Sequence, residues 1–415
     1  MELKRVVVTG LGALTPVGND APSFWAALAA GQGGVGVITR FDAARFKCRI
    51  AAELKGFDPL QHFDRKELRH LDPFAQYGIV AAEEALRDAD MLRGVAADRV
   101  GVIWGAGCGG VQTLQDEIGS YVRNEDNPRF SPFFIPKMIA DICAGHISIR
   151  HGFSGPNYAT VAACSSSAVA ISDALNLIRL GKADAFVAGG SEAAINGCGI
   201  GGFSAMQALS TRNDDPATAS RPFDKGRDGF VLGEGAGAMI LESLDSALAR
   251  GARIYAELVG AGLSADAYHI TASHPDGEGA MAAMRRAVED AGMKLEDVDH
   301  INTHGTSTPI GDRSEPLAVQ RLFGEHAKSI TLNSTKSMTG HLLGAAGSVE
   351  AIATVLALRD GLVPPTINHF EDDPDIAPLD YSFNHATRRR VAFALTNSFG
   401  FGGHNVCLAF KRWDA

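Results

Sequence analysis

The chain has 415 residues, of which 46% are hydrophobic and 21% are charged, with a formal net charge of −10. These proportions are those of a water-soluble protein, and the acidic balance without any basic stripe argues against a nucleic-acid partner. No segment approaches the roughly 18 consecutive apolar residues that cross a bilayer, and no secretory leader precedes the first apolar run, so we expect a cytoplasmic protein without a membrane partner.

The length of the chain and the spacing of its cysteines indicate how many cores to expect and which kinds of cysteine site to exclude. A chain of this size exceeds the roughly 250–300 residues that one hydrophobic core organises, which predicts two cores or two halves of one large unit. Six cysteines are scattered along the chain: Cys48, Cys108, Cys143, Cys164, Cys198 and Cys407. They form no C-x-x-C pair, which argues against a disulfide framework and a zinc site, so we expect no metal centre.

In chain order, apolar runs typical of strands alternate with amphipathic stretches typical of helices, which is the pattern of the α/β class. Strands are expected over residues 98–107, where the run enters a glycine turn, over 184–190 and over 391–396. Helices are expected over residues 278–292 and 345–360.

A faint internal repeat runs through this pattern. An offset of 180 residues lays three positions of one half on three of the other: Val169 on Val349, Arg179 on Arg359 and Gly181 on Gly361. The same offset lays the helix after Cys164 on the helix after His341, and the turn at 105–110 corresponds to the one at 304–311. We expect two duplicated halves, residues 1–251 and 252–415, joined near Gly251 without a flexible linker.

Cys164 stands among small residues in the run 161–168, where an apolar pattern of helical period begins. A thiol at a helix N-terminus experiences the positive end of the helix dipole and free backbone N–H groups. Both lower its pKa and favour the thiolate, which is the nucleophile. The alternative is an inert cysteine among small core residues, which is the commoner fate of a lone cysteine.

Three polar, glycine-rich segments supply partners for this thiol, and each follows an apolar run. They are residues 302–312 with His304, residues 333–347 with Lys336 and His341, and residues 397–405 with Phe401. Loops at strand ends are where α/β proteins place their chemistry. Cysteine and histidine in separate loops are the arrangement expected for covalent acyl transfer.

Together these segments resemble the signature motifs of the β-ketoacyl-acyl-carrier-protein synthases, and most closely the elongating type II enzymes of dissociated bacterial systems. The resemblance runs from Arg5 to Phe410. It implies a thiolase-like fold, with two α/β halves stacked as five layers and the site between them. It also implies acyl carrier protein as the partner, and a homodimer in which the strand after Cys164, at 184–188, pairs across the interface.

The resemblance further implies an acyltransferase that performs a ping-pong decarboxylative condensation without a cofactor. Cys164 would take the acyl chain from its carrier, with the oxyanion held by the backbone N–H groups of Cys164 and Phe401. His304 and His341 would donate hydrogen bonds to the thioester oxygen of malonyl-acyl-carrier-protein while CO₂ leaves. Lys336 would tune the field around the two histidines.

Other positions acquire expected roles in the same way. Thr306 and Thr308 would bind the phosphopantetheine arm, Phe399 would shield the malonyl carboxylate, and Phe401 would gate the acyl pocket. Glu350 would be the counter-charge of Lys336, Asp312 would support the site structurally, and Cys108 would line the acyl pocket. The carrier protein would meet a basic patch of Lys66, Arg69 and Arg129. A structural cation near Glu350 stays open.

Several alternatives compete with this interpretation. The turn at 105–110 fits G-x-G-x-x-G after a strand, which by itself suggests a nicotinamide oxidoreductase; a packing turn beside an acyl pocket is the other interpretation. Cys108 and Trp104 are unusual there, so the chain-length preference is open. The enzyme could also serve a specialised lipid or polyketide pathway, or be the silent partner of another ketosynthase. No G-x-S-x-G elbow occurs, which argues against an α/β-hydrolase.

Overall fold

The structure, a computed structural model, describes residues 3–125 and 127–414. Among them, eleven strands form one sheet in the order β12-β10-β9-β14-β15-β8-β1-β7-β6-β4-β5. These strands are β1 (Val6–Leu14), β4 (Val100–Gly105), β5 (Asn157–Thr160), β6 (Ala185–Glu192), β7 (Gly235–Ser243), β8 (Ala256–Ala265), β9 (His300–Asn302), β10 (Thr331–Asn333), β12 (Asp380–Tyr381), β14 (Phe393–Gly400) and β15 (His404–Arg412). Two small ribbons join β2 (Gly36–Val37) to β3 (Ile50–Ala51) and β11 (Leu362–Val363) to β13 (Thr387–Arg388).

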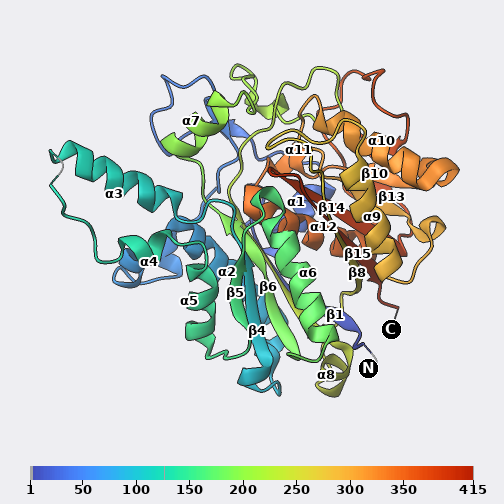
Figure 1. The fold of residues 1–415 in the computed structure, drawn as a ribbon, viewed down its shortest axis with the longest axis horizontal. Helices are drawn as coiled ribbons and strands as arrows, with labels where there is room; N and C mark the ends of the chain where they lie inside the picture. Colours follow the sequence, from blue (N-terminus) through green and yellow to red (C-terminus); the bar gives the residue numbers. More distant parts are fainter. Residues whose placement is uncertain (1–2, 126, 415) are drawn as a thin grey trace.

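The helices connect and cover this sheet (Figure 1). They are α1 (Ala21–Ala29), α2 (Pro73–Asp88), α3 (Val111–Arg123), α4 (Phe134–Met138), α5 (Ile142–His151), α6 (Ser166–Arg179), α7 (Gly197–Ala205), α8 (Leu244–Ala249), α9 (Glu278–Asp290), α10 (Gly311–Phe323), α11 (Lys336–Thr339) and α12 (Ala346–Asp360). No helix in the described ranges is long and apolar enough to cross a membrane.

The strand order confirms the expected duplication. The run β5-β4-β6-β7-β1 repeats as β10-β9-β14-β15-β8, and each neighbouring pair keeps the same parallel or antiparallel sense in both runs. The two runs meet at only two residue pairs, Val7 with Glu257 and Val8 with Ala256. One architecture has therefore been built twice, and its halves are continuous at this seam.

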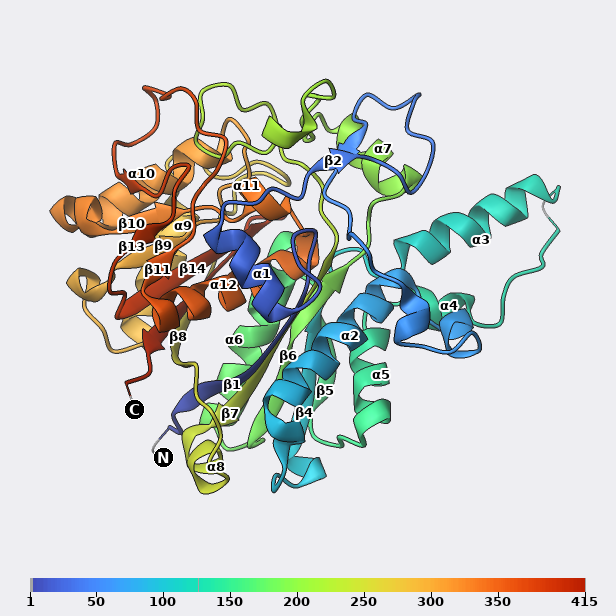
Figure 2. The ribbon, with the colours of Figure 1, turned by 180° about the vertical axis from the view of Figure 1, so that it is seen from behind.

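The layers follow from which helix faces are apolar. Helices α6 and α12 pack against each other between the two halves of the sheet, and α12 is buried from Ala346 to Leu358. Such a helix is apolar on every face because protein surrounds it. Helices α2 and α5 cover the outer face of the first half, and α9 and α10 cover the outer face of the second (Figure 2). The expected five layers are confirmed.

The expected elements are present with shifted ends. The segments at 98–107, 184–190 and 391–396 form β4, β6 and β14, and those at 278–292 and 345–360 form α9 and α12. One expectation was wrong: β6 lies between β7 and β4, which use both of its hydrogen-bonding edges. It therefore has no edge for a partner subunit, and the outer strand of this half is β5.

Candidate active site

Cys164 lies in a tight turn, Ala163–Ser165, between β5 and α6. Ala163 has a φ of 49°, so the chain turns sharply and presents the cysteine at the start of the helix. The end of β14 closes over this turn. Ser398 donates to the carbonyl of Cys164 at 3.1 Å, and a Cβ at Gly400 would come within 2.5 Å of the carbonyl oxygen of Ala162.

This burial changes the expected acidity of the thiol. Burial raises the pKa of Cys164 to about 12, although the charge of Lys336 and the backbone N–H groups of Phe401 and Cys164 lower it. The prediction of a pKa lowered by the helix terminus was wrong for the free enzyme. The reason is that a thiolate withdrawn from water loses more solvation than the helix end restores. The two N–H groups nevertheless lie close to the sulfur, and their role as an oxyanion hole stays a prediction.

His304 and His341 reach the same cavity from different loops. Their rings lie 5.3 Å apart between centroids, nearly perpendicular to each other, and the cavity of about 360 Å³ is also lined by Cys164, Phe399 and Phe401. Burial, and then the charge of Lys336, hold the pKa of both imidazoles well below 6.5. Both rings are therefore neutral at physiological pH, and each has one N–H to donate.

Lys336 decides which nitrogen of His304 carries that proton. Its Nζ lies 3.3 Å from Nδ1 of His304. An ammonium group can only donate, so Nδ1 accepts and the proton is assigned to Nε2. Lys336 also forms a buried ion pair with Glu350 of α12. Burial raises the pKa of Glu350 to about 7, against the lowering effect of Lys336.

A buried carboxylate that the sequence did not indicate supports the His304 loop. Glu315 accepts hydrogen bonds from the backbone N–H groups of His304 at 2.9 Å and Gly305 at 3.0 Å. It also accepts one from the side chain of Asn397 at 2.9 Å. Its position in line with Ala318, Val319 and Leu322 on the buried face of α10 was the available signal.

Thr306 and Thr308 lie along the cavity wall, with their hydroxyls 2.9 Å apart. Asp312 is fully buried at the start of α10 and accepts the backbone N–H groups of Ser307 and Phe223. Burial raises the pKa of Asp312 to about 7. These hydrogen bonds join Asp312 to the loop that carries the two threonines, and its structural role at the site stays a prediction.

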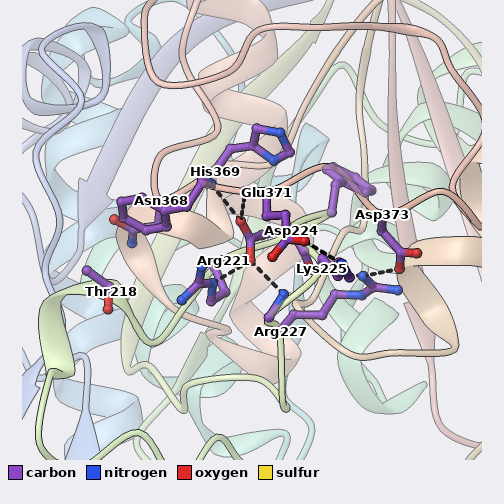
Figure 3. Close-up of polar contacts among 12 residues, drawn as sticks. Thr218, Arg221, Asp224, Lys225, Arg227, Asn368, His369, Glu371 and Asp373 are labelled. Carbon is purple, nitrogen blue, oxygen red and sulfur yellow. Dashed lines mark hydrogen bonds and ion pairs between the residues drawn. The ribbon is translucent and has the colours of Figure 1, made fainter.

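A second loop, residues 221–229, contacts the loop that carries the two threonines. Figure 3 shows how its charged side chains also meet the segment at residues 368–373. Arg227 donates to the carbonyls of Thr308 at 3.3 Å and Pro309 at 3.0 Å, and pairs with Asp373 at 2.7 Å. Asp224 accepts the backbone N–H groups of residues 370 and 371 and is bonded by Arg221. Sequence reasoning missed this clamp, for which the only signal was a charged run before a buried strand.

Other expected residues lie away from the cavity. The side chain of Cys108 is exposed and does not line the cavity. Trp104 points into the outer core beside α2 and α5, and bonds Ser191 at 2.9 Å. The N–H groups of Gly107 and Cys108 bind the carboxylate of Glu192, so they are occupied within the protein rather than free for a dinucleotide phosphate.

Lys66, Arg69 and Arg129 are all exposed. Lys66 immediately precedes a short turn at Glu67–His70, Arg69 lies within that turn, and Arg129 follows α3. The ring of His70 lies 4.0 Å from that of Phe133 between centroids, which brings the two segments side by side. The role of this patch stays a prediction. Within the described ranges, no three His, Cys, Asp or Glu side chains are grouped to hold a metal ion.

Comparison with known proteins gives consistent matches along the chain. The family model described as Beta-ketoacyl synthase, N-terminal domain matches residues 3–247, and the corresponding C-terminal domain matches residues 255–370. The 3-oxoacyl-[acyl-carrier-protein] synthase 2 of Synechocystis sp. is 50% identical over 415 residues, covering 100% of this chain and 99% of its own. The enzyme of that name from Staphylococcus aureus is 50% identical over 414 residues, covering 99% of each.

Solved structures agree. A beta-ketoacyl synthase from Burkholderia phymatum has a TM-score of 0.92 at 35% identity, covering 99% of this chain and 100% of its own. The ketosynthase of a type II polyketide system, solved in complex with its acyl-carrier protein, has a TM-score of 0.91 at 32% identity with the same coverage. By its sequence and its fold, the chain belongs to the beta-ketoacyl synthase family.

Proposed function

We propose that this protein elongates fatty acids by condensing an acyl thioester on Cys164 with malonyl-acyl-carrier-protein. The observation that carries the proposal is the meeting of a buried thiol and two neutral imidazoles in one cavity. Support comes from the relatives named 3-oxoacyl-[acyl-carrier-protein] synthase 2, which are 50% identical over nearly the whole chain.

In the first half-reaction, Cys164 attacks the thioester carbonyl of the acyl carrier. The sulfur forms a bond to the acyl carbon, the bond to the carrier sulfur breaks, and the cysteine proton leaves with the carrier as its free thiol. The N–H groups of Cys164 and Phe401 hold the oxyanion. Each such preorganised donor is worth about 10²–10³ in rate.

In the second half-reaction, the malonyl thioester oxygen accepts hydrogen bonds from His304 and His341. The bond to the carboxylate breaks, CO₂ leaves, and the electron pair remains as an enolate. The enolate carbon attacks the acyl thioester on Cys164 and displaces the cysteine thiolate, which takes a proton from solvent water. The chain gains two carbons. Loss of CO₂ drives the bond formation, so the proposal includes neither a redox cofactor nor a catalytic metal.

The carrier protein would deliver both substrates. Thr306 and Thr308, which line the cavity, would hydrogen-bond the phosphopantetheine arm. Lys66, Arg69 and Arg129 would attract the acidic carrier. Support comes from the polyketide ketosynthase of similar fold that was solved with its carrier protein. That neighbour keeps a specialised polyketide pathway as the alternative, but its 32% identity is well below the 50% of the relatives named 3-oxoacyl-[acyl-carrier-protein] synthase 2.

We further propose a homodimer in the cytoplasm that joins two β5 strands. One edge of β5 is paired with β4 and its other edge has no partner strand among the described residues. Beside it, Tyr158 is 37% exposed and Val161 64% exposed, as is expected of a surface that a second copy covers. Light scattering at micromolar concentration should give twice the chain mass, and a monomer would contradict this proposal.

The decisive experiment for the activity is peptide mass spectrometry after mixing the protein with acyl-acyl-carrier-protein, without a malonyl donor. Trypsin releases residues 151–179, in which Cys164 is the only cysteine. We expect an acyl mass on this peptide that is absent in Cys164→Ala, and the series of accepted chains would separate primary elongation from a specialised pathway. No adduct with any chain length would favour a silent partner.

A further inference from the structure

Glu192 is a fully buried carboxylate at the end of β6 that the mechanism above does not use. Its Oε2 accepts the backbone N–H groups of Gly107 at 2.8 Å and Gly344 at 3.0 Å, and its Oε1 accepts that of Cys108 at 3.0 Å. Within the described residues, no lysine, arginine or histidine forms an ion pair with it. A buried carboxylate that accepts hydrogen bonds from backbone N–H groups and has no counter-ion is stabilised by the dipoles of those backbone groups.

At two of these positions, Gly107 and Gly344, the carboxylate and the neighbouring backbone leave no space for a Cβ. A Cβ at Gly107 would come within 2.7 Å of Oε2 of Glu192. A Cβ at Gly344 would lie 2.8 Å from that oxygen and 2.3 Å from the nitrogen of Gly107. The turn after β4 and the turn after His341 are thus pressed together with this carboxylate between them, and they belong to opposite halves of the chain.

The turn that bears Cys164 is the third member of this junction. It packs against the turn at Leu343–Ala345, and a Cβ at Gly107 would lie 3.4 Å from the carbonyl oxygen of Ala163. Gly344 is three residues after His341, so the carboxylate connects the neighbours of the nucleophile to the neighbour of one imidazole.

We propose that Glu192 is a positioning residue of the condensing site: it ties the turn at 107–109 to Gly344, sets the placement of Cys164 relative to His341, and acts on the thiol through its charge. The inference rests on the proposed function, because the distance that it controls is the one the enolate must cross. A misplacement of about 1 Å at such a site can lower the rate by about 10²-fold.

The charges around the thiol agree with this role. The carboxylate of Glu192 raises the pKa of Cys164, whereas Lys336 lowers it. His304 and His341 are neutral, so Glu192 and Lys336 are the charges that act on the thiol. Burial raises the pKa of Glu192 to about 7, although the surrounding N–H groups oppose this shift.

The test compares Glu192→Gln with Glu84→Gln. Glu84 is a matched control: it accepts the backbone N–H groups of Ala13 and Ala21 at 2.8 and 2.7 Å, and burial raises its pKa to about 7 as well. Iodoacetamide labelling of Cys164 is followed on the 151–179 peptide between about pH 8 and about pH 10, where the rate follows the thiolate fraction. This readout needs no acyl substrate, so it stands even if the proposed condensation fails.

We expect Glu192→Gln to label faster than the parent at each pH, because the carboxylate no longer opposes ionisation, while Glu84→Gln labels like the parent. Condensation by Glu192→Gln should fall about 10- to 100-fold. Glu192→Asp keeps the charge but is shorter, so it should label like the parent and still condense slowly, which keeps the proposal testable if the glutamine variant does not fold. Labelling unchanged in folded Glu192→Gln, or full condensation by Glu192→Asp, would overturn the inference.

Discussion

Replacing Lys336 by methionine removes the cation that stands behind both active-site histidines. Lys336 is 1% exposed and is paired with Glu350, which is also buried. Removal of one partner of a buried pair typically costs about 3–5 kcal/mol, because the other charge is left without compensation. We therefore expect Lys336→Met to unfold at a lower denaturant concentration. Lys336→Met/Glu350→Gln should recover much of the loss, because it removes both charges.

The electrostatic effect of the same change should not be recovered by the second substitution. Lys336 lowers the pKa of His304, His341 and Cys164. Without it, both imidazole pKa values rise toward 6.5, although burial still holds them below it. Protonated imidazoles then appear at a higher pH, and the field that stabilises the enolate changes.

The assay is CO₂ release from malonyl-acyl-carrier-protein as a function of pH, with circular dichroism to show that each variant is folded. The acid limb of the profile should move to higher pH in both the single and the double variant. Labelling of Cys164 should become slower at each pH, because the thiol pKa rises further. An acid limb that stays in place in the folded double variant would refute the view that Lys336 acts on the histidines through its charge.

Three further predictions follow from the packing. Arg227→Lys cannot hold two carbonyls of the His304 loop at once, so the KM for carrier-bound substrates should rise about tenfold with iodoacetamide labelling unchanged; an unchanged KM would contradict the clamp. Gly344→Ala should lower the free energy of unfolding, measured by denaturant titration, by more than about 3 kcal/mol, because there is no space for a Cβ at that position. The control is Gly145→Ala within α5, where a Cβ meets no atom within 4 Å. This control should be neutral or stabilising by up to about 1 kcal/mol. Below about pH 6.5, His304 and His341 take up protons in the unfolded state, whereas the buried rings of the folded state stay neutral. The free energy of unfolding should therefore fall more steeply with decreasing pH in the parent than in His304→Asn/His341→Asn. Equal slopes would show that the fold keeps neither ring neutral.

Local pattern was sufficient to select the candidate residues that the structure brings together around one cavity. Each candidate residue lies in a short segment whose residue types indicate one kind of chemistry: Cys164, His304, Lys336 and His341. Such a segment can be recognised without knowing which parts of the chain pack around it. The alternation of apolar runs likewise predicted the class and the main elements, because side-chain period is a property of a short stretch of chain. The repeat at 180 residues predicted the duplication that the strand order confirms.

Tertiary structure decided what depends on distant parts of the chain. The pKa of Cys164 is set by burial beneath β14, more than 200 residues away, and the helix terminus that the sequence suggested is outweighed. Strand position could not be predicted either: whether β6 or β5 lies at the edge depends on the order of the whole sheet.

The residues that support the site could not be predicted from the sequence, for the same reason. Glu192, Arg227 and Glu315 act through backbone groups that belong to other segments, and nothing in their own surroundings in the sequence identifies those partners. A motif specifies which side chains can react. Desolvation and hydrogen bonding depend on what packs around them, and for this protein only the assembled halves determine that.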